Sequence, residues 1–164
     1  MRLDTLNTCT PAEAAEQLTP CVDIPRWVNA IVDARPFSSE AEVIAFAENA
    51  AHPWTEAEID GALTHHPRIG ERARGNTTEA TMSRGEQAGV STAGETQAAL
   101  LEGNRAYEEK FGRVFLIRAA GRSAEDILGA LNERLHNTPE QELDIIAQQL
   151  REIAVLRLKG VLAA

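Results

Sequence analysis

The chain has 164 residues, of which 43% are hydrophobic and 25% charged, and this composition is typical of a globular domain. Only 4% of the residues are aromatic, so we expect an aliphatic, alanine-rich core that suits closely packed helices. The formal charge of −9, from 25 acidic and 16 basic residues, argues against a nucleic-acid partner, because such partners bind clustered cations.

The lack of targeting signals and the small number of cysteines both predict a cytoplasmic protein. The sequence contains no apolar run of the roughly 18 residues that a membrane span requires, and no apolar leader follows Met1. The last three residues do not form a peroxisomal signal. Cys9 and Cys21 are too few for a disulfide framework, so we expect two reduced thiols, with a single bridge as the alternative.

Helix-start signals recur along the chain and predict an all-α fold. In a capping box, Ser or Thr is followed three residues later by Glu or Gln, and the two side chains satisfy N–H groups of the first turn. Such pairs are Thr10 with Glu13, Ser39 with Glu42, Thr55 with Glu58, Ser83 with Glu86, and Thr138 with Gln141. We predict a compact single-domain bundle over residues 1–164 with about eight helices, at 11–19, 25–34, 40–50, 55–65, 84–90, 94–111, 123–136 and 138–159.

Two stretches lack the helical pattern. Residues 66–82 are predicted to form a long loop, and long loops within compact domains are often functional. Residues 112–121 are predicted to be extended and buried, because an apolar run lies between Gly112 and Gly121.

His66 is the first candidate for chemistry. A residue before proline is disfavoured in a helix, so His66, which precedes Pro67, should mark the end of the helix predicted at 55–65. The dipole at a helix C-terminus favours a protonated imidazole, which suits a proton donor. The alternative is a histidine that only caps carbonyl groups. The four histidines show no metal-binding spacing, so we predict no metal site.

Residues 83–87 place a hydroxyl, a carboxylate and an amide close together after the predicted loop. Ser83 and Glu86 fit a capping box, which accounts for both residues without any function. Alternatively, the N–H groups of a helix starting here could bind an anionic or carbonyl ligand.

Arg157 interrupts an apolar stripe. Leu143, Ile146, Leu150 and Ile153 step by three and four residues, and the next position of that face is Arg157. A buried arginine needs an anionic or accepting partner, because an unpaired buried charge is costly. The partner could be an internal carboxylate or a bound ligand, or the side chain could extend to solvent near the helix end.

Several motifs, in the same order, resemble the 2-oxo-4-hydroxy-4-carboxy-5-ureidoimidazoline (OHCU) decarboxylase family. They are Arg35-Pro36-Phe37, His66-Pro67-Arg68-Ile69-Gly70, Ser83-Arg84-Gly85-Glu86-Gln87, Asn104-Arg105-Ala106-Tyr107, Lys110-Phe111-Gly112, Phe115-Leu116-Ile117, Leu131-Asn132-Glu133-Arg134-Leu135 with Asn137, and Leu156-Arg157-Leu158. The chain differs from many members at Arg68, Gly85 and Arg118. The resemblance covers nearly the whole chain.

The resemblance implies a cofactor-free carbon–carbon lyase of urate breakdown that converts OHCU, a small ureide, into (S)-allantoin. It also implies a homodimer. The implied catalytic residues are His66 and Glu86, and the implied substrate-binding residues are Pro67, Ser83, Arg84, Gly85, Glu86, Gln87, Phe115, Leu116, Ile117, Arg118, Ala119 and Arg157. We therefore expect His66, Glu86 and Arg157 to line one pocket. The alternatives are a helical interaction module and another urate-pathway hydrolase or isomerase on the same scaffold.

Overall fold

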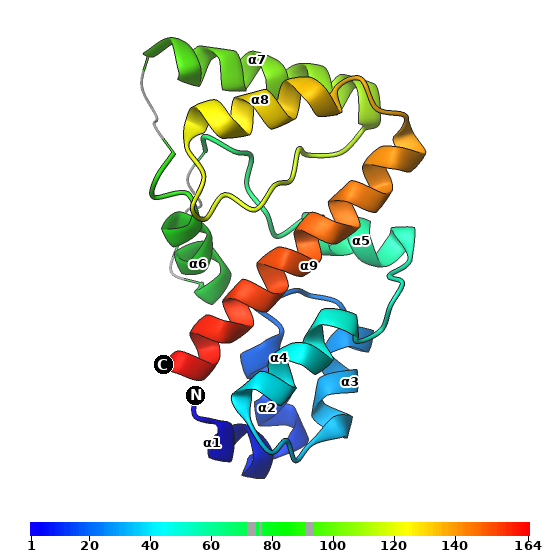
Figure 1. Ribbon diagram of the computed structural model, residues 1–164, viewed down its shortest axis with the longest axis vertical. Coiled ribbons are helices and arrows are strands. Elements are labelled where there is room, and N and C mark those ends of the chain that lie inside the picture. The colour runs from blue at the N-terminus through cyan, green and yellow to red at the C-terminus, as the bar shows by residue number, and fades with distance from the viewer. Residues whose placement is uncertain (72–74, 76, 91–93) are drawn as a thin grey trace. The chain divides into compact units, whose positions relative to one another are not determined.

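The computed structural model describes residues 1–71, 75, 77–90 and 94–164 (Figure 1). Within these ranges the regular structure consists of nine helices without a strand, which confirms the predicted all-α class. The helices are α1 (Leu3–Thr8), α2 (Pro11–Leu18), α3 (Pro25–Ala34), α4 (Glu40–Asn49), α5 (Glu56–Leu63), α6 (Thr78–Glu86), α7 (Gly94–Phe111), α8 (Ala124–Arg134) and α9 (Pro139–Ala163). Residues 1–62 and 151–164 form one compact unit, and residues 63–150 form a second.

Most of the predicted helix starts use their capping residues. Reciprocal hydrogen bonds between the capping side chains and the backbone confirm the boxes at Thr10, Thr55 and Thr138. At α4 the box is half formed. Ser39 Oγ accepts from the Glu42 N–H, but the Glu42 carboxylate accepts from the N–H of Ser38 and not from that of Ser39. Local hydroxyl chemistry therefore sets most of these boundaries.

The capping box predicted at Ser83 and Glu86 is wrong. α6 begins earlier, where Thr77 Oγ1 accepts from the Ala80 N–H at 3.1 Å, so Ser83 lies inside the helix and Glu86 is its last residue. The helix expected at 84–90 is displaced toward the N-terminus, so residues 78–82 of the expected loop are helical. Residues 72–74 and 76 of that loop lie outside the described residues. A hydroxyl alone can cap a helix, and Ala80 occupies the position where a capping box would have Glu or Gln. α1, a six-residue helix without a side-chain cap, was not predicted.

In the unit of residues 1–62 and 151–164, α2, α3 and α4 pack around a buried tryptophan. Trp27 is fully buried, and its indole N–H donates to the carbonyl of Ala47 at 3.0 Å. Leu18, Ile31 and Val43 are completely buried in the same unit. Cys9 and Cys21, both among the described residues, are not joined by a disulfide.

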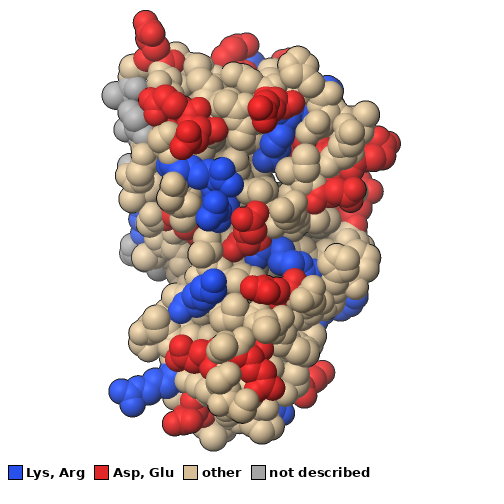
Figure 2. Space-filling model, in the orientation of Figure 1, with Lys and Arg blue, Asp and Glu red and all other residues tan. Residues whose placement is uncertain are grey.

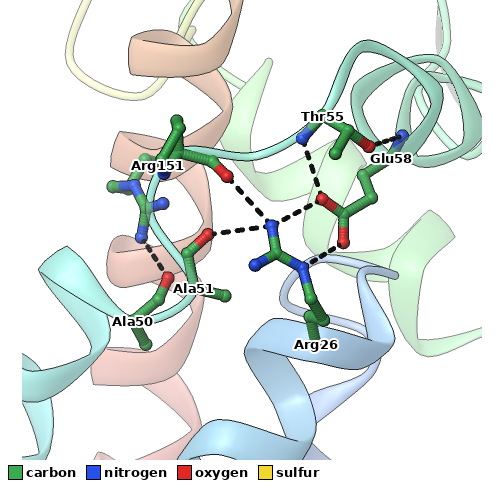
Figure 3. Close-up of polar contacts among 7 residues, drawn as sticks. Arg26, Ala50, Ala51, Thr55, Glu58 and Arg151 are labelled. Atoms are coloured by element: carbon green, nitrogen blue, oxygen red, sulfur yellow. Dashed lines mark hydrogen bonds and ion pairs between the residues drawn. The ribbon is translucent and has the colours of Figure 1, made fainter.

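Two arginines hold the turn between α4 and α5 (Figure 3). Arg26 pairs with Glu58, with its Nε 2.9 Å from Oε2 and its Nη2 2.8 Å from Oε1. Arg151 donates from Nη1 to the carbonyl of Ala50 at 3.0 Å, and its guanidinium lies 4.0 Å from the centre of the Trp54 ring. The turn is therefore held by charged side chains that approach it from two helices.

The second unit is built around α7 and α8, which lie side by side (Figure 1). A Cβ at Gly103 would lie 2.4 Å from Cδ2 of Leu131, so the close approach of these helices requires glycine there. Their core includes Leu100, Tyr107 and Ile127, all fully buried.

The described residues include no helix that is both long and apolar enough to cross a membrane. On the face drawn in Figure 2, acidic and basic side chains are interspersed.

Candidate functional site

His66 follows the end of α5 closely, as predicted. The helix ends at Leu63, two residues earlier than expected, and the His66 N–H donates to the Leu63 carbonyl at 3.0 Å in the turn beyond it. The His66 side chain is half-buried. It lines a pocket of about 460 Å³, together with Thr64, His65, Pro67, Thr77, Glu79 and Ala80. The structure thus places His66 and Pro67 at the same hollow.

Two buried amides fasten the loop that follows His66. The Oε1 of Gln87 accepts from the Gly70 N–H at 3.0 Å, and the Nδ2 of Asn104 donates to the carbonyl of Ile69 at 2.9 Å. Gln87 is 6% exposed and Asn104 is 3% exposed. The loop is therefore bound both to the C-terminal cap of α6 and to α7, which brings residues 66–70 and 83–87 together.

Residues 83–87 lie at the C-terminal end of α6. Ser83 is buried, Arg84 and Glu86 are half-buried, and Gly85 is exposed. Arg84 Nη1 donates to the carbonyl of Gly75 at 2.9 Å. The interpretation of this run as a helix N-terminus that offers N–H groups to a ligand is wrong, because the negative end of the helix dipole lies here instead. Any ligand contact from this run must come from its side chains or from its carbonyl groups.

The predicted binding segment 115–119 has neither helix nor strand structure, and four of its residues are buried. Its backbone is held from other elements. Arg134 Nη1 donates to the carbonyl of Leu116 at 2.7 Å, and the Arg118 N–H donates to Gln149 Oε1 at 2.9 Å. Arg118 itself is half-buried. The prediction of a buried stretch over 112–121 is therefore confirmed only for residues 115–117 and 119, and the stretch is free of helix, as its sequence indicated.

Arg157 lies on the buried face of α9, as its place in the apolar stripe predicted. It is 5% exposed, and its Nη1 donates to the carbonyl of Pro20 at 2.9 Å. Arg157 belongs to the unit of residues 1–62 and 151–164, whereas His66 and Glu86 belong to the other unit. The expectation that all three line one pocket stays a prediction.

Sequence analysis missed two buried charged residues behind the segment 115–119. Arg134 is 6% exposed and Glu142 is 1% exposed. The signal that revealed Arg157 would have found both. Arg134 continues the apolar stripe of Ile127 and Leu131, and Glu142 precedes Ile146 by four residues on the buried face of α9. Among the described side chains, no three or more His, Cys, Asp or Glu residues are grouped as metal ligands would be.

Two solved structures share the fold. A crystal structure of OHCU decarboxylase in the presence of (S)-allantoin is 27% identical, covers 92% of this chain and 99% of its own, and superposes with a TM-score of 0.73. A crystal structure of (S)-allantoin synthase is 20% identical, covers 98% of this chain and 54% of its own, and has a TM-score of 0.71. The chain therefore has the all-helical fold of the decarboxylase in the first of these structures.

The chain belongs to the OHCU decarboxylase family, whose model matches residues 7–159. It is 31% identical to the 2-oxo-4-hydroxy-4-carboxy-5-ureidoimidazoline decarboxylase of Amia calva over 81% of this chain and 78% of that protein. It is 38% identical to the uric acid degradation bifunctional protein TTL of Arabidopsis thaliana over 59% of this chain. The matched region spans only 31% of the Arabidopsis protein.

Proposed function

We propose that this protein decarboxylates OHCU to (S)-allantoin without a cofactor, and that the whole chain acts as one OHCU decarboxylase-like domain. The observation that carries the proposal is the attachment of the His66 loop to the end of α6. Gln87 accepts a hydrogen bond from Gly70 at 3.0 Å, so the element that carries the histidine is bound to the element that carries Glu86. Family membership supports the choice of OHCU over other ureides.

The substrate supplies its own electron sink. In OHCU the carboxylate leaves from C4 as carbon dioxide, and the electron pair of the broken C–C bond forms a C4=C5 double bond. The π electron pair of the C5=N bond moves to the nitrogen, which takes up a proton. The C4 hydroxyl then loses its proton to become a carbonyl, while C5 gains a proton on one face. The protein must orient the carboxylate and deliver protons, and positioned groups can lower the barrier by several kcal/mol.

The proposed roles follow the chemistry of each side chain. His66 transfers the proton, because it is half-buried at a pocket and imidazole titrates near neutral pH. Glu86 orients or polarises the substrate or His66, and Arg157 binds an anionic or carbonyl part of the substrate. Ser83, Gln87 and the backbone of residues 115–119 hold the ring and ureido amides. Pro67, Arg84 and Gly85 complete the binding set.

The assembly and location of the protein are further parts of the proposal. We propose a homodimer, on the resemblance to the family, and a cytoplasmic location, because Cys9 and Cys21 are not joined by a disulfide and free thiols persist in a reducing compartment. Light scattering of the purified protein would test the dimer, and a mass equal to that of one chain would contradict it.

Replacement of His66 tests the proposed function. His66→Asn should leave the stability unchanged, because a half-buried side chain beyond the helix end is altered, but should lower stereospecific turnover by roughly 10² to 10⁴. The assay supplies freshly generated OHCU and follows (S)-allantoin by circular dichroism, since unaided decay gives racemic product.

Two neighbouring variants serve as controls for this experiment. His136→Asn alters an exposed histidine near the end of α8 and should keep full activity. His65→Asn alters the adjacent histidine of the same pocket and shows which imidazole transfers the proton. Near-normal turnover by His66→Asn would refute the assignment of His66.

A further inference from the structure

We propose that Arg134 and Gln149 are positioning residues for OHCU decarboxylation, because they fix the backbone of residues 115–119 without touching the substrate. The inference rests on the proposed function, in which this segment holds the ring and ureido amides. A segment without helix or strand structure cannot set its own shape through a regular hydrogen-bond ladder, so its carbonyl and N–H groups must be held by other elements.

Arg134 holds the first half of the segment. Its Nη1 donates to the Leu116 carbonyl at 2.7 Å, and its guanidinium lies 4.5 Å from the centre of the Phe115 ring. Only 6% of Arg134 is exposed, so this contact forms where water competes little. One side chain thus fixes both a carbonyl and a ring of consecutive residues.

A buried network orients Arg134 in turn. Its Nε donates to Glu142 Oε1 at 2.6 Å, and the hydroxyl of Tyr107 donates to the same oxygen at 2.6 Å. Asn137 Nδ2 donates to the other carboxylate oxygen at 3.0 Å. The carboxylate therefore receives hydrogen bonds from three elements of the unit, and the planar guanidinium has a defined orientation toward the segment.

Gln149 holds the second half of the segment. Its Oε1 accepts from the Arg118 N–H at 2.9 Å, and the carbonyl of Arg118 accepts from Arg122 Nε at 2.8 Å. The two hydrogen bonds at Arg118 and the one at Leu116 lie on either side of Ile117. These contacts therefore restrict the orientation of its peptide groups.

Gln149 provides the sharper test, because it is half-buried and its replacement does not break a buried ion pair. Gln149→Leu removes the acceptor for Arg118 at similar size, whereas Gln149→Glu keeps an acceptor oxygen in place. Gln148→Leu alters the adjacent, exposed residue of α9 and is the matched control. For each variant, kcat and KM for OHCU are measured beside the folded fraction from chemical denaturation.

We expect Gln149→Leu to raise KM and to lower kcat/KM about tenfold, the usual effect of losing one well-placed hydrogen bond. Gln149→Glu should restore most of this loss, and Gln148→Leu should match the unmodified protein. A variant that is merely less stable loses rate in proportion to its folded fraction and keeps its KM. An unchanged KM in Gln149→Leu, or no recovery in Gln149→Glu, would overturn the inference.

The turnover of OHCU by the unmodified protein distinguishes a failure of this inference from a failure of the proposed function. Failure of that protein to turn over OHCU would overturn the proposed function and the positioning role together. Normal turnover, with Gln149→Leu equally active, would overturn the positioning role alone.

Discussion

Each unit uses arginine to hold an irregular segment, but the two sites differ in their exposure to water. At the turn between α4 and α5, the side chain of Arg26 is 52% exposed and that of its partner Glu58 is 19% exposed (Figure 3). Behind residues 115–119, the side chains of Arg134 and Glu142 are 8% and 1% exposed. The distances within the two pairs are similar, so the surroundings distinguish them.

The environment of an ion pair therefore decides how much the pair contributes to stability. An exposed pair is screened by water and salt and contributes little to stability. A buried pair has already lost its hydration, so removal of one partner leaves the other as an uncompensated charge. Three substitutions test this difference, in order of the expected effect.

Removal of the buried carboxylate should have the largest effect. Glu142→Leu leaves the Arg134 guanidinium without its anionic partner and should lower the free energy of unfolding by about 3–5 kcal/mol. Urea denaturation measures the change. The double variant Arg134→Met with Glu142→Leu removes both charges and should recover much of the loss. A Glu142→Leu protein as stable as the unmodified one would contradict this account of the pair.

A change in the same network should have an intermediate effect. Tyr107→Phe removes the hydrogen bond to Glu142 and should cost about 1.5–3 kcal/mol, as expected for a bond to a charged group. Burial, and secondly this bond, raise the pKa of Tyr107 above its ordinary value of 10. The tyrosine's contribution to stability is thus complete below about pH 10 and is lost at higher pH.

The stability gap between the unmodified protein and Tyr107→Phe should therefore narrow above about pH 10. Urea denaturation of both proteins in neutral and in alkaline buffer measures it. A gap that stayed constant across this range would show that the phenol does not ionise with unfolding.

Loss of the carboxylate from the more exposed pair should have the smallest effect. Glu58→Gln keeps an oxygen that can cap α5 but loses the charge, and should cost at most about 1 kcal/mol at neutral pH. The hydrogen bond from Arg26 is the main cause that lowers the pKa of Glu58 from 4.5 to about 2. A depressed pKa stabilises the fold above the unfolded value, so this contribution is lost as the pH falls from about 4.5 to about 2.

Urea midpoints for Glu58→Gln and the unmodified protein should accordingly converge across that acidic range. Added salt at neutral pH should also reduce the difference between them. A difference that persisted unchanged at the acidic end would place the effect in packing and not in charge.

Local signals predicted much of the helical fold. Thr10, Thr55 and Thr138 begin helices as expected, because each capping box is satisfied within four residues. The capping-box pattern does not locate the start of α6, because Thr77 caps this helix with a hydroxyl alone and Ala80 stands where the pattern has Glu or Gln. The sequence therefore predicts the start of a helix when both capping side chains lie within a few residues of each other.

The site was predictable only in part, because its most informative contacts join distant residues. The apolar stripe located Arg157 on a buried face, and the same reasoning would have located Arg134 and Glu142. No local pattern shows that Gln87 accepts from Gly70, or that Gln149 accepts from Arg118, since those pairings depend on the packing of helices.

The chromophores of the protein are divided between its two units. Both tryptophans, Trp27 and Trp54, belong to the unit of residues 1–62 and 151–164, whereas Tyr107, the one tyrosine of the sequence, belongs to the unit of residues 63–150. Tryptophan fluorescence consequently follows one unit without any label. The tyrosine band, resolved from the overlapping tryptophan absorbance in derivative spectra, follows the other. Coincident transitions of the two signals would identify a single cooperative folding unit, and separate transitions would identify two.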